Sequence, residues 1–289
     1  SQVLIDKIRN RFGFYLSIPV IVSLVLFNFW PFIETIYLSF MTQRRGELIF
    51  NGIKNYQRLF GDDIFRTALI NSFIFYIIRL PIMLITCTLL ASVIHRGIKK
   101  LKSFFEASYF IPVLVDAVAY SMIFLLIFQD RGIANFVLSK LGIENIAWLK
   151  QSIPAKVLII IVVSWRWTGY NMVLFLAAIQ NIPEDYYEAA TIDRANSFQK
   201  FIYITLPSLK PVILFTSIMS TIGTLNLFTE PFLLTNGGPN NGTMTLGLYI
   251  YNQAFVSLNM PYASTVSVVI LIIVGTLTYL QLKIGERDN

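Results

Sequence analysis

Two long stretches without a charged residue set the strongest limit on how this chain can fold. One covers residues 13–33 and the other covers residues 231–282. A membrane-spanning helix needs about 20 consecutive, mostly apolar residues, and uncharged runs of this length are read as candidate spans. Only 13% of the 289 residues are charged, whereas a soluble domain carries about 25%. The sequence therefore predicts an all-α integral membrane protein.

Six segments are long and apolar enough to cross a bilayer. They cover residues 13–40, 68–94, 104–128, 155–180, 208–235 and 262–283, and we expect them to form one transmembrane domain over residues 1–289. Residues 235–243 (TNGGPNNGT) separate the last two segments, because their Gly, Pro and Asn residues break a helix. The first apolar segment is too long for the core of a cleavable signal sequence, so no such signal is expected.

The distribution of Lys and Arg indicates that both termini lie in the cytoplasm. The loop after the second predicted span holds four basic residues, Arg96, Lys99, Lys100 and Lys102, whereas the loop after the fifth span has no charge. Basic residues concentrate in cytoplasmic loops of membrane proteins. The net charge of +7 has the same explanation. No basic stripe lies on a soluble element, so we expect no nucleic-acid partner.

The chain lacks the residues that several classes of active site require. Cys87 is its single cysteine and His95 its single histidine, which excludes an internal disulfide and a histidine-clustered metal site. No Walker phosphate loop (GxxxxGK followed by Ser or Thr) occurs, and no paired catalytic groups lie in a cytoplasmic domain. We therefore expect no catalytic residue, no metal and no cofactor on this chain.

The loop between the fourth and fifth predicted spans, residues 181–207, has a helical pattern of its own. Pro183 ends the fourth span, because the residue before a proline is disfavoured in helical geometry. Glu184 and Asp185 then open a new helix, where acidic groups complement the helix dipole. A second helical turn is expected over residues 197–205. This pattern predicts a docking surface for a soluble partner or a helix lying on the bilayer, and its small apolar face and acidic residues favour docking.

The same loop holds Glu188, Ala189 and Ala190, then Ile192, Asp193 and Ala195, then residues 204–207 (ITLP). It resembles the EAA loop of ABC importer permeases, in which a coupling helix inserts into a cleft of the ATPase subunit. Other parts of the chain are similar to the same family: Phe65, Ala68, Leu69, Asn71 and Ser72; Trp167, Gly169, Met172, residues 175–178, Gln180, Ile182 and Pro183; residues 234–239, Thr243, Tyr251, Ala254 and Phe255.

The resemblance is to the carbohydrate-uptake branch, of maltose or glycerol-phosphate type, and it implies a permease subunit in a bacterial cytoplasmic (inner) membrane. The expected partners are a second permease, two ATP-binding cassette subunits that carry ATP and Mg, an extracellular substrate-binding protein and the lipid bilayer. It implies ATPase-coupling roles for Glu188, Ala189, Ala190, Asp193, Arg194, Ala195, Leu206 and Pro207.

One position departs from the family pattern. The loop usually has glycine where this chain has Arg194. Glycine permits a turn with positive φ at little cost. Arg194 therefore either strains this turn or adopts an ordinary φ, and it offers an extra salt bridge to the ATPase.

Polar residues within predicted spans are functional candidates, because they are expensive in a membrane. They are Arg79, Asp116, Arg166, Asn171, Asn226 and Glu230. Each also has a structural explanation. Arg166 can pair with Asp116, Glu230 can be hydrated near the outer end of its span, and Arg79 can bind carbonyls that Pro81 leaves free.

A sugar site needs aromatic faces for stacking and hydroxyl or amide groups for hydrogen bonds. Trp167, Tyr170 and Asn171 share one helical face, and so do Ser220 and Thr224. Similarity to maltose-type permeases points to the same two spans and adds Gly223, and Asn226 completes the candidate substrate path. These aromatic residues can instead pack only between helices.

Other functions and contacts stay open at this stage. The cargo can be a sugar or oligosaccharide, or instead a polyol, glycerol phosphate or a uronate oligosaccharide. An ion-coupled secondary carrier with Asp116 or Glu230 as the coupling acid is a rival, although such carriers often show internal repeats and none is seen here. A scaffold or receptor subunit is another rival. The uncharged outer residues 237–239 and 248–255 are expected to contact the binding protein or the partner permease.

Overall fold

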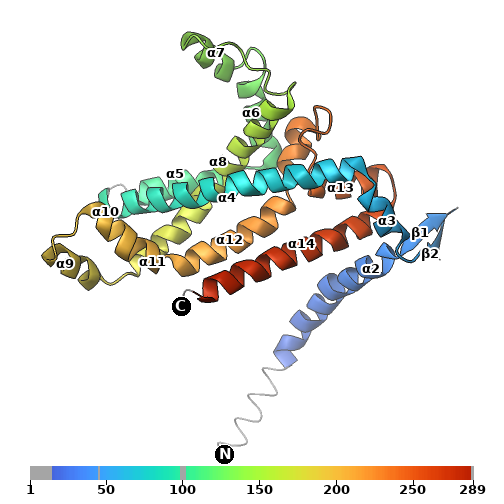
Figure 1. The fold of residues 1–289 in the computed structure, drawn as a ribbon, viewed down its shortest axis with the longest axis horizontal. Coiled ribbons are helices and arrows are strands. Elements are labelled where there is room, and N and C mark those ends of the chain that lie inside the picture. Colours follow the sequence, from blue (N-terminus) through green and yellow to red (C-terminus); the bar gives the residue numbers. More distant parts are fainter. Residues whose placement is uncertain (1–14, 45, 98–101, 288–289) are drawn as a thin grey trace, which may run out of the picture. The chain divides into compact units, whose positions relative to one another are not determined.

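The computed structural model describes residues 15–44, 46–97 and 102–287 (Figure 1). Helices dominate it, and the all-α membrane class predicted from the sequence is confirmed. Within these residues, five helices are long and apolar enough to cross a membrane: Tyr15–Ser39, Asp63–His95, Ala117–Lys140, Ser152–Gln180 and Met260–Gly285. A sixth span results if Ser197–Ser208 and Lys210–Leu225, bent by 64° relative to one another, are counted together.

The chain divides into two compact units, residues 1–61 with 250–269 and residues 62–249 with 270–289. The first unit contains η1 (Val25–Phe29), α2 (Trp30–Ser39), β1 (Met41–Arg44), β2 (Glu47–Phe50), α3 (Lys54–Phe60) and η4 (Asn252–Val256), together with the start of α14 (Met260–Arg287). β1 and β2 form an antiparallel pair in which Met41 lies opposite Phe50. The helical segment before Ser39 exposes nearly all of its large apolar side chains.

Asn55 organises the first unit. Its side-chain amide donates to the carbonyl oxygens of Ser39 (3.2 Å) and Met41 (2.7 Å). Thr265 Oγ1 donates to the same Ser39 carbonyl at 3.0 Å, so α14 is tied to the end of α2. The bonds to Ser39 satisfy a backbone acceptor that the end of α2 leaves without an intrahelical partner.

The second unit contains the remaining helices: α4 (Asp63–Gly97), α5 (Lys102–Leu114), α6 (Ala117–Phe128), α7 (Ile133–Lys140), α8 (Ser152–Gln180), α9 (Glu184–Ile192), α10 (Ser197–Lys200), η2 (Phe201–Thr205), α11 (Leu206–Ser208), α12 (Lys210–Leu225), η3 (Pro231–Thr235) and α13 (Leu246–Tyr251). α4, α5 and α12 pack on α8 (Figure 1). Part of their core is the cluster of Met83, Cys87, Phe175, Ile179 and Leu209, all at most 2% exposed.

α5 and α8 approach unusually closely. A Cβ added to Gly169 would overlap the carbonyl oxygen of Tyr109. Only a residue without a side chain fits at such a backbone-to-backbone contact. The position of Gly169 therefore sets the distance between these two helices.

Two predicted spans differ from the helices that form. The segment 104–128 is divided at residues 115–116, because Asp116 starts a new helix by accepting hydrogen bonds from the backbone N–H groups of Val118 (2.9 Å) and Ala119 (3.3 Å). In the segment 208–235, α12 ends at Leu225, and the helix resumes at residue 229 and continues into η3 at Pro231. Residues 226–230 bring polar groups beside α8.

The segment after η3 is held by α4 of the same unit. The Asn71 amide donates to the carbonyl oxygens of Asn241 (3.0 Å) and Met244 (2.9 Å), and Ser72 Oγ accepts from the Leu246 N–H (3.0 Å). Residues 242–246 are buried. This part of the uncharged stretch is thus covered by its own chain.

Candidate functional site

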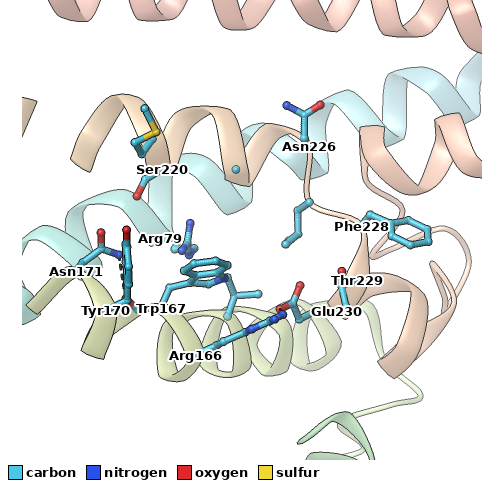
Figure 2. Close-up of a pocket in the computed structure, with 14 residues that line it drawn as sticks. Arg79, Arg166, Trp167, Tyr170, Asn171, Ser220, Asn226, Phe228, Thr229 and Glu230 are labelled. Atoms are coloured by element: carbon cyan, nitrogen blue, oxygen red, sulfur yellow. Dashed lines mark hydrogen bonds and ion pairs between the residues drawn. The ribbon is translucent and has the colours of Figure 1, made fainter. Parts of the chain in front are cut away.

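The second unit contains a cavity of about 260 Å³ between α4, α8, α12 and the segment 226–230 (Figure 2). Its lining combines aromatic, hydroxyl, amide and charged side chains. The residues are Arg79, Val163, Arg166, Trp167, Tyr170, Asn171, Met219, Ser220, Gly223, Asn226, Leu227, Phe228, Thr229 and Glu230. Polar groups are rare in the middle of a membrane domain, so this collection marks the site.

α8 supplies the aromatic side of the cavity. Trp167 and Tyr170 lie one turn apart, and their rings meet edge to face with centroids 6.1 Å apart. The Tyr170 side chain is 40% exposed, which leaves its ring and hydroxyl accessible. Asn171 is buried, and its Nδ2 donates to the Trp167 carbonyl at 2.9 Å. The arrangement offers aromatic faces beside hydrogen-bonding groups.

α12 supplies the opposite side. Ser220 is 7% exposed and has its hydroxyl in the lining, one turn before Gly223. A Cβ added to Gly223 would have no atom within 4 Å, so the glycine leaves open space there. Asn226 caps the helix end and donates from Nδ2 to the Ile222 carbonyl at 2.8 Å.

A hydrogen-bonded network connects three elements at one end of the cavity. Tyr120 of α6 donates to Glu230 Oε1 (2.8 Å), and Arg166 of α8 donates to the Tyr120 hydroxyl (2.8 Å). Arg166 also lies 3.5 Å from Glu230 Oε1 and over the rings of Tyr120 and Trp167. Figure 2 shows the Arg166 and Glu230 side chains pointing toward one another.

This network corrects two of the structural explanations given above. Arg166 pairs with Glu230, whereas Asp116 is occupied as the helix cap of α6. Glu230 is only 2% exposed, so it is not a hydrated residue at a span end. A buried carboxylate needs hydrogen-bond donors and an opposite charge. The Tyr120 hydroxyl supplies a donor, and the Arg166 guanidinium supplies the charge.

Arg79 enters the cavity from α4. It is 6% exposed, and its Nη1 donates to Thr224 Oγ1 at 2.5 Å. Its guanidinium therefore contacts a side chain of α12 and not the backbone carbonyls near Pro81 that the sequence suggested. Thr224 itself is 2% exposed.

Six of the seven predicted substrate-path residues line this one cavity: Trp167, Tyr170, Asn171, Ser220, Gly223 and Asn226. Thr224 lies behind the lining and contacts Arg79. Sequence reasoning missed Tyr120, Phe228 and Thr229. Tyr120 is inconspicuous within a strongly apolar helix, and the other two fall in a segment expected to continue a span.

The loop 181–207 forms the predicted helix–turn–helix. α9 has no buried residue. Asn196 and Gln199 form a capping box at the start of α10, with two reciprocal hydrogen bonds of 2.8 Å. Tyr187 and Thr205 share a hydrogen bond of 2.8 Å, which joins the two arms. Of the predicted coupling residues, Glu188, Ala189, Asp193, Arg194 and Pro207 are exposed and Ala190, Ala195 and Leu206 half-buried.

Arg194 adopts a left-handed conformation, with φ of 58°. Its N–H bonds to the Thr191 carbonyl (3.0 Å) and the Ala195 N–H bonds to the Ala190 carbonyl (2.9 Å). This is the Schellman pattern that commonly ends helices, usually with glycine at the left-handed position. Arg194 therefore does not adopt an ordinary negative φ, and the turn holds it in the strained, left-handed conformation.

Comparison with known proteins places the chain among transport components. The family model described as binding-protein-dependent transport system inner membrane component matches residues 98–288. The chain is 43% identical to the lactose transport system permease protein LacF of Rhizobium radiobacter, covering 93% of this chain and 92% of the relative. It is 34% identical to the arabinooligosaccharides transport system permease protein AraP of Halalkalibacterium halodurans, covering 91% and 84% respectively.

The fold also matches a solved structure. A chain from the crystal structure of a bacterial ABC transporter involved in the import of the acidic polysaccharide alginate superposes with a TM-score of 0.86. Its sequence is 20% identical, and the match covers 99% of each chain. This similarity supports the fold and not the cargo.

Proposed function

Because the chain belongs to the family of binding-protein-dependent transport system inner membrane components, we propose that it is a permease subunit of an ATP-driven importer of a sugar or oligosaccharide. The observation that carries the cargo class is the cavity, in which the Trp167 and Tyr170 rings lie opposite the Ser220 hydroxyl. Aromatic faces stack on the apolar faces of sugar rings, and amide and hydroxyl groups bind sugar hydroxyls. The names of the relatives, which refer to lactose and to arabinooligosaccharides, point to the same class of cargo.

The importer would contain further subunits. The helical segment Tyr15–Ser39 buries none of its apolar window within this chain, which suits contacts with lipid and with a second permease. An extracellular binding protein would deliver the sugar. Two ATP-binding cassette subunits would bind and hydrolyse ATP with Mg on the cytoplasmic side, where both termini of this chain would also lie.

Coupling between ATP hydrolysis and transport would use α9. The helix has no buried residue and its acidic residues include the exposed Glu188, as a docking surface for a soluble partner requires. Closure of the ATPases on ATP binding would move the two coupling helices together and open the cavity outward. Hydrolysis would reverse this motion and release the sugar inward. The contact that would differ between the two states is the one between the closed ATPases and residues 188–195.

The first test is to purify the chain from its native membrane and identify its partners by mass spectrometry. A second permease, an ATPase and a binding protein are expected. A chain that purifies alone and moves solute without ATP, with uptake abolished by a proton ionophore, would establish the secondary-carrier alternative instead.

The second test is charge reversal in the coupling helix. Glu188→Lys should reduce ATP-driven uptake in vesicles at least tenfold while the complex still assembles. Glu144→Lys reverses another exposed acidic residue, outside the loop, and should leave uptake within a factor of two. Normal uptake by Glu188→Lys would contradict the coupling role of α9.

A further inference from the structure

Arg79 is a charged residue whose polar partners do not balance its charge. Its side chain is 6% exposed and lines the cavity. Its Nη1 donates to the neutral Thr224 hydroxyl, and its Nε has no hydrogen-bond partner. Within the part of the chain that the structure describes, no carboxylate lies within ion-pair distance of Arg79.

The one carboxylate in the cavity lining is already engaged. Glu230 accepts from the Tyr120 hydroxyl at 2.8 Å and lies 3.5 Å from Arg166. The lining thus combines two guanidinium groups with one carboxylate, and arginine keeps its charge in proteins. Burying a cation without a counter-charge is costly, in lipid as in a protein core.

A purely structural role for this residue would not require a buried positive charge. If the bond to Thr224 served only to fasten α4 to α12, a neutral amide would make the same contact without burying a charge. What arginine adds is a planar set of donors, of which Nη1 is bonded to Thr224 and Nε is buried without a hydrogen-bond partner. Arg79 lines the cavity, so an oxygen acceptor that arrives with the cargo can reach the guanidinium edge that faces it.

We propose that Arg79 is a specificity-determining residue that donates to an oxygen of the transported saccharide, and that Thr224 is its positioning residue. This inference rests on the proposed function, because it assigns the cavity to the saccharide. The acceptor is a ring hydroxyl of a neutral sugar or the carboxylate of a uronate. Trp167 and Tyr170 supply the stacking surface in the same cavity.

The test uses the complete importer, purified with its partners. Tritiated lactose and a tritiated diuronate are the two probes, and their affinity for the nucleotide-free complex without binding protein is measured by scintillation proximity. The variants are Arg79→Met, Arg79→Lys, Thr224→Val and Thr224→Ser. Thr216→Val is the matched control, because Thr216 is equally buried on α12 and donates only to its own helix.

Arg79→Met should weaken binding of the transported probe about 10- to 100-fold, the range for a hydrogen bond to a charged group. The melting temperature of the cargo-free complex should not fall, because the variant removes a buried charge that has no ion-pair partner in the described residues. Thr224→Val should weaken binding about 3- to 10-fold, the loss of one ordinary hydrogen bond. Thr224→Ser should restore the affinity, and Thr216→Val should leave it unchanged.

The two probes distinguish the source of the acceptor. A loss confined to the diuronate identifies a carboxylate, and Arg79→Lys then retains part of the affinity because it keeps the charge. A loss for lactose identifies a hydroxyl. The inference is overturned if Arg79→Met binds both probes within a factor of two of the wild type, or if its complex melts several degrees lower.

Failure of the proposed function would look different, because the chain would then purify without an ATPase or a binding protein. If the complete importer forms but its wild type binds neither probe, the cargo is another solute. Stimulation of ATP hydrolysis by the co-purified, cargo-loaded binding protein still tests Arg79, because it does not require a known cargo. A tenfold higher half-saturating concentration in Arg79→Met would then support the residue's role, and an unchanged one would reject it.

Discussion

Glu230 accepts a hydrogen bond of 2.8 Å from the hydroxyl of Tyr120, a residue 110 positions earlier in the chain. Arg166 completes the group by donating to the same hydroxyl. Three elements distant in sequence, α6, α8 and the segment before η3, are thereby joined around one buried carboxylate at the edge of the cavity.

The first prediction concerns this buried carboxylate. Arg166→Met should lower the free energy of unfolding by about 3 kcal/mol, because it leaves Glu230 without a cation. The double variant Arg166→Met with Glu230→Gln should recover most of that loss. Equilibrium unfolding in mixed micelles provides the measurement. Lys150→Met is the control, since its pair with Asp130 is exposed and is expected to contribute less than about 1 kcal/mol. Equal losses in the two single variants would contradict the role of the network.

The second prediction concerns the open space beside Gly223. Gly223→Phe should abolish ATP-driven uptake, because the new ring occupies the cavity without meeting another atom at its Cβ. Assembly and melting temperature should stay close to the wild type. Gly275→Phe, on α14, also meets nothing at its Cβ and should transport normally. Uptake by Gly223→Phe at the wild-type rate would show that the cargo takes another path.

The third prediction concerns the contact between α5 and α8. Gly169→Ala should destabilise the protein by about 3 kcal/mol or more, because the methyl group overlaps a backbone carbonyl that cannot move without displacing α5. Thermal unfolding of the purified protein measures the effect. Gly275→Ala places the same methyl group in open space and should be neutral or slightly stabilising. Similar melting temperatures for the two variants would disprove the close packing.

The fourth prediction concerns the end of α9. Arg194→Gly should stabilise the loop by about 0.5–1 kcal/mol, because glycine removes the cost of a left-handed residue but loses more chain entropy on folding. Arg194→Ala keeps the unfavourable conformation and should give no such gain. Amide hydrogen exchange over residues 189–195 reports the difference. Faster exchange in the glycine variant would mean that the arginine side chain stabilises this turn.

Local features of the fold were predictable from the sequence. Apolar runs determine where helices cross the membrane, and the Pro and acidic residues at 183–185 begin α9 where expected. The break at residues 115–116 was missed because its signal is one capping aspartate within an apolar segment. Trp167, Tyr170, Asn171 and Ser220 could be named because they lie on shared helical faces of two spans. Gly223 followed from the resemblance to maltose-type permeases, and Asn226 from its polarity within a span.

The electrostatic partners were not predictable in the same way. The pairing of Arg166 with Glu230, and of Arg79 with Thr224, depends on how α4, α8 and α12 pack, and no local pattern encodes it. Asp116 lay closer in sequence to Arg166 than Glu230 does and was therefore the more obvious partner. Tyr120 had no signal at all, since a lone tyrosine in an apolar helix usually only packs.

The division between α5 and α6 has a mechanical consequence. α5 is fixed to α8 by the contact at Gly169, whereas α6 begins with its own capping residue, so the hydrogen bonds on either side of residues 115–116 are satisfied separately. Rotation at this junction breaks no helical hydrogen bond. Because α6 is itself held on α8 through the Tyr120 hydroxyl and Arg166, the junction lets each of the two helices take its own direction while both stay fixed to α8.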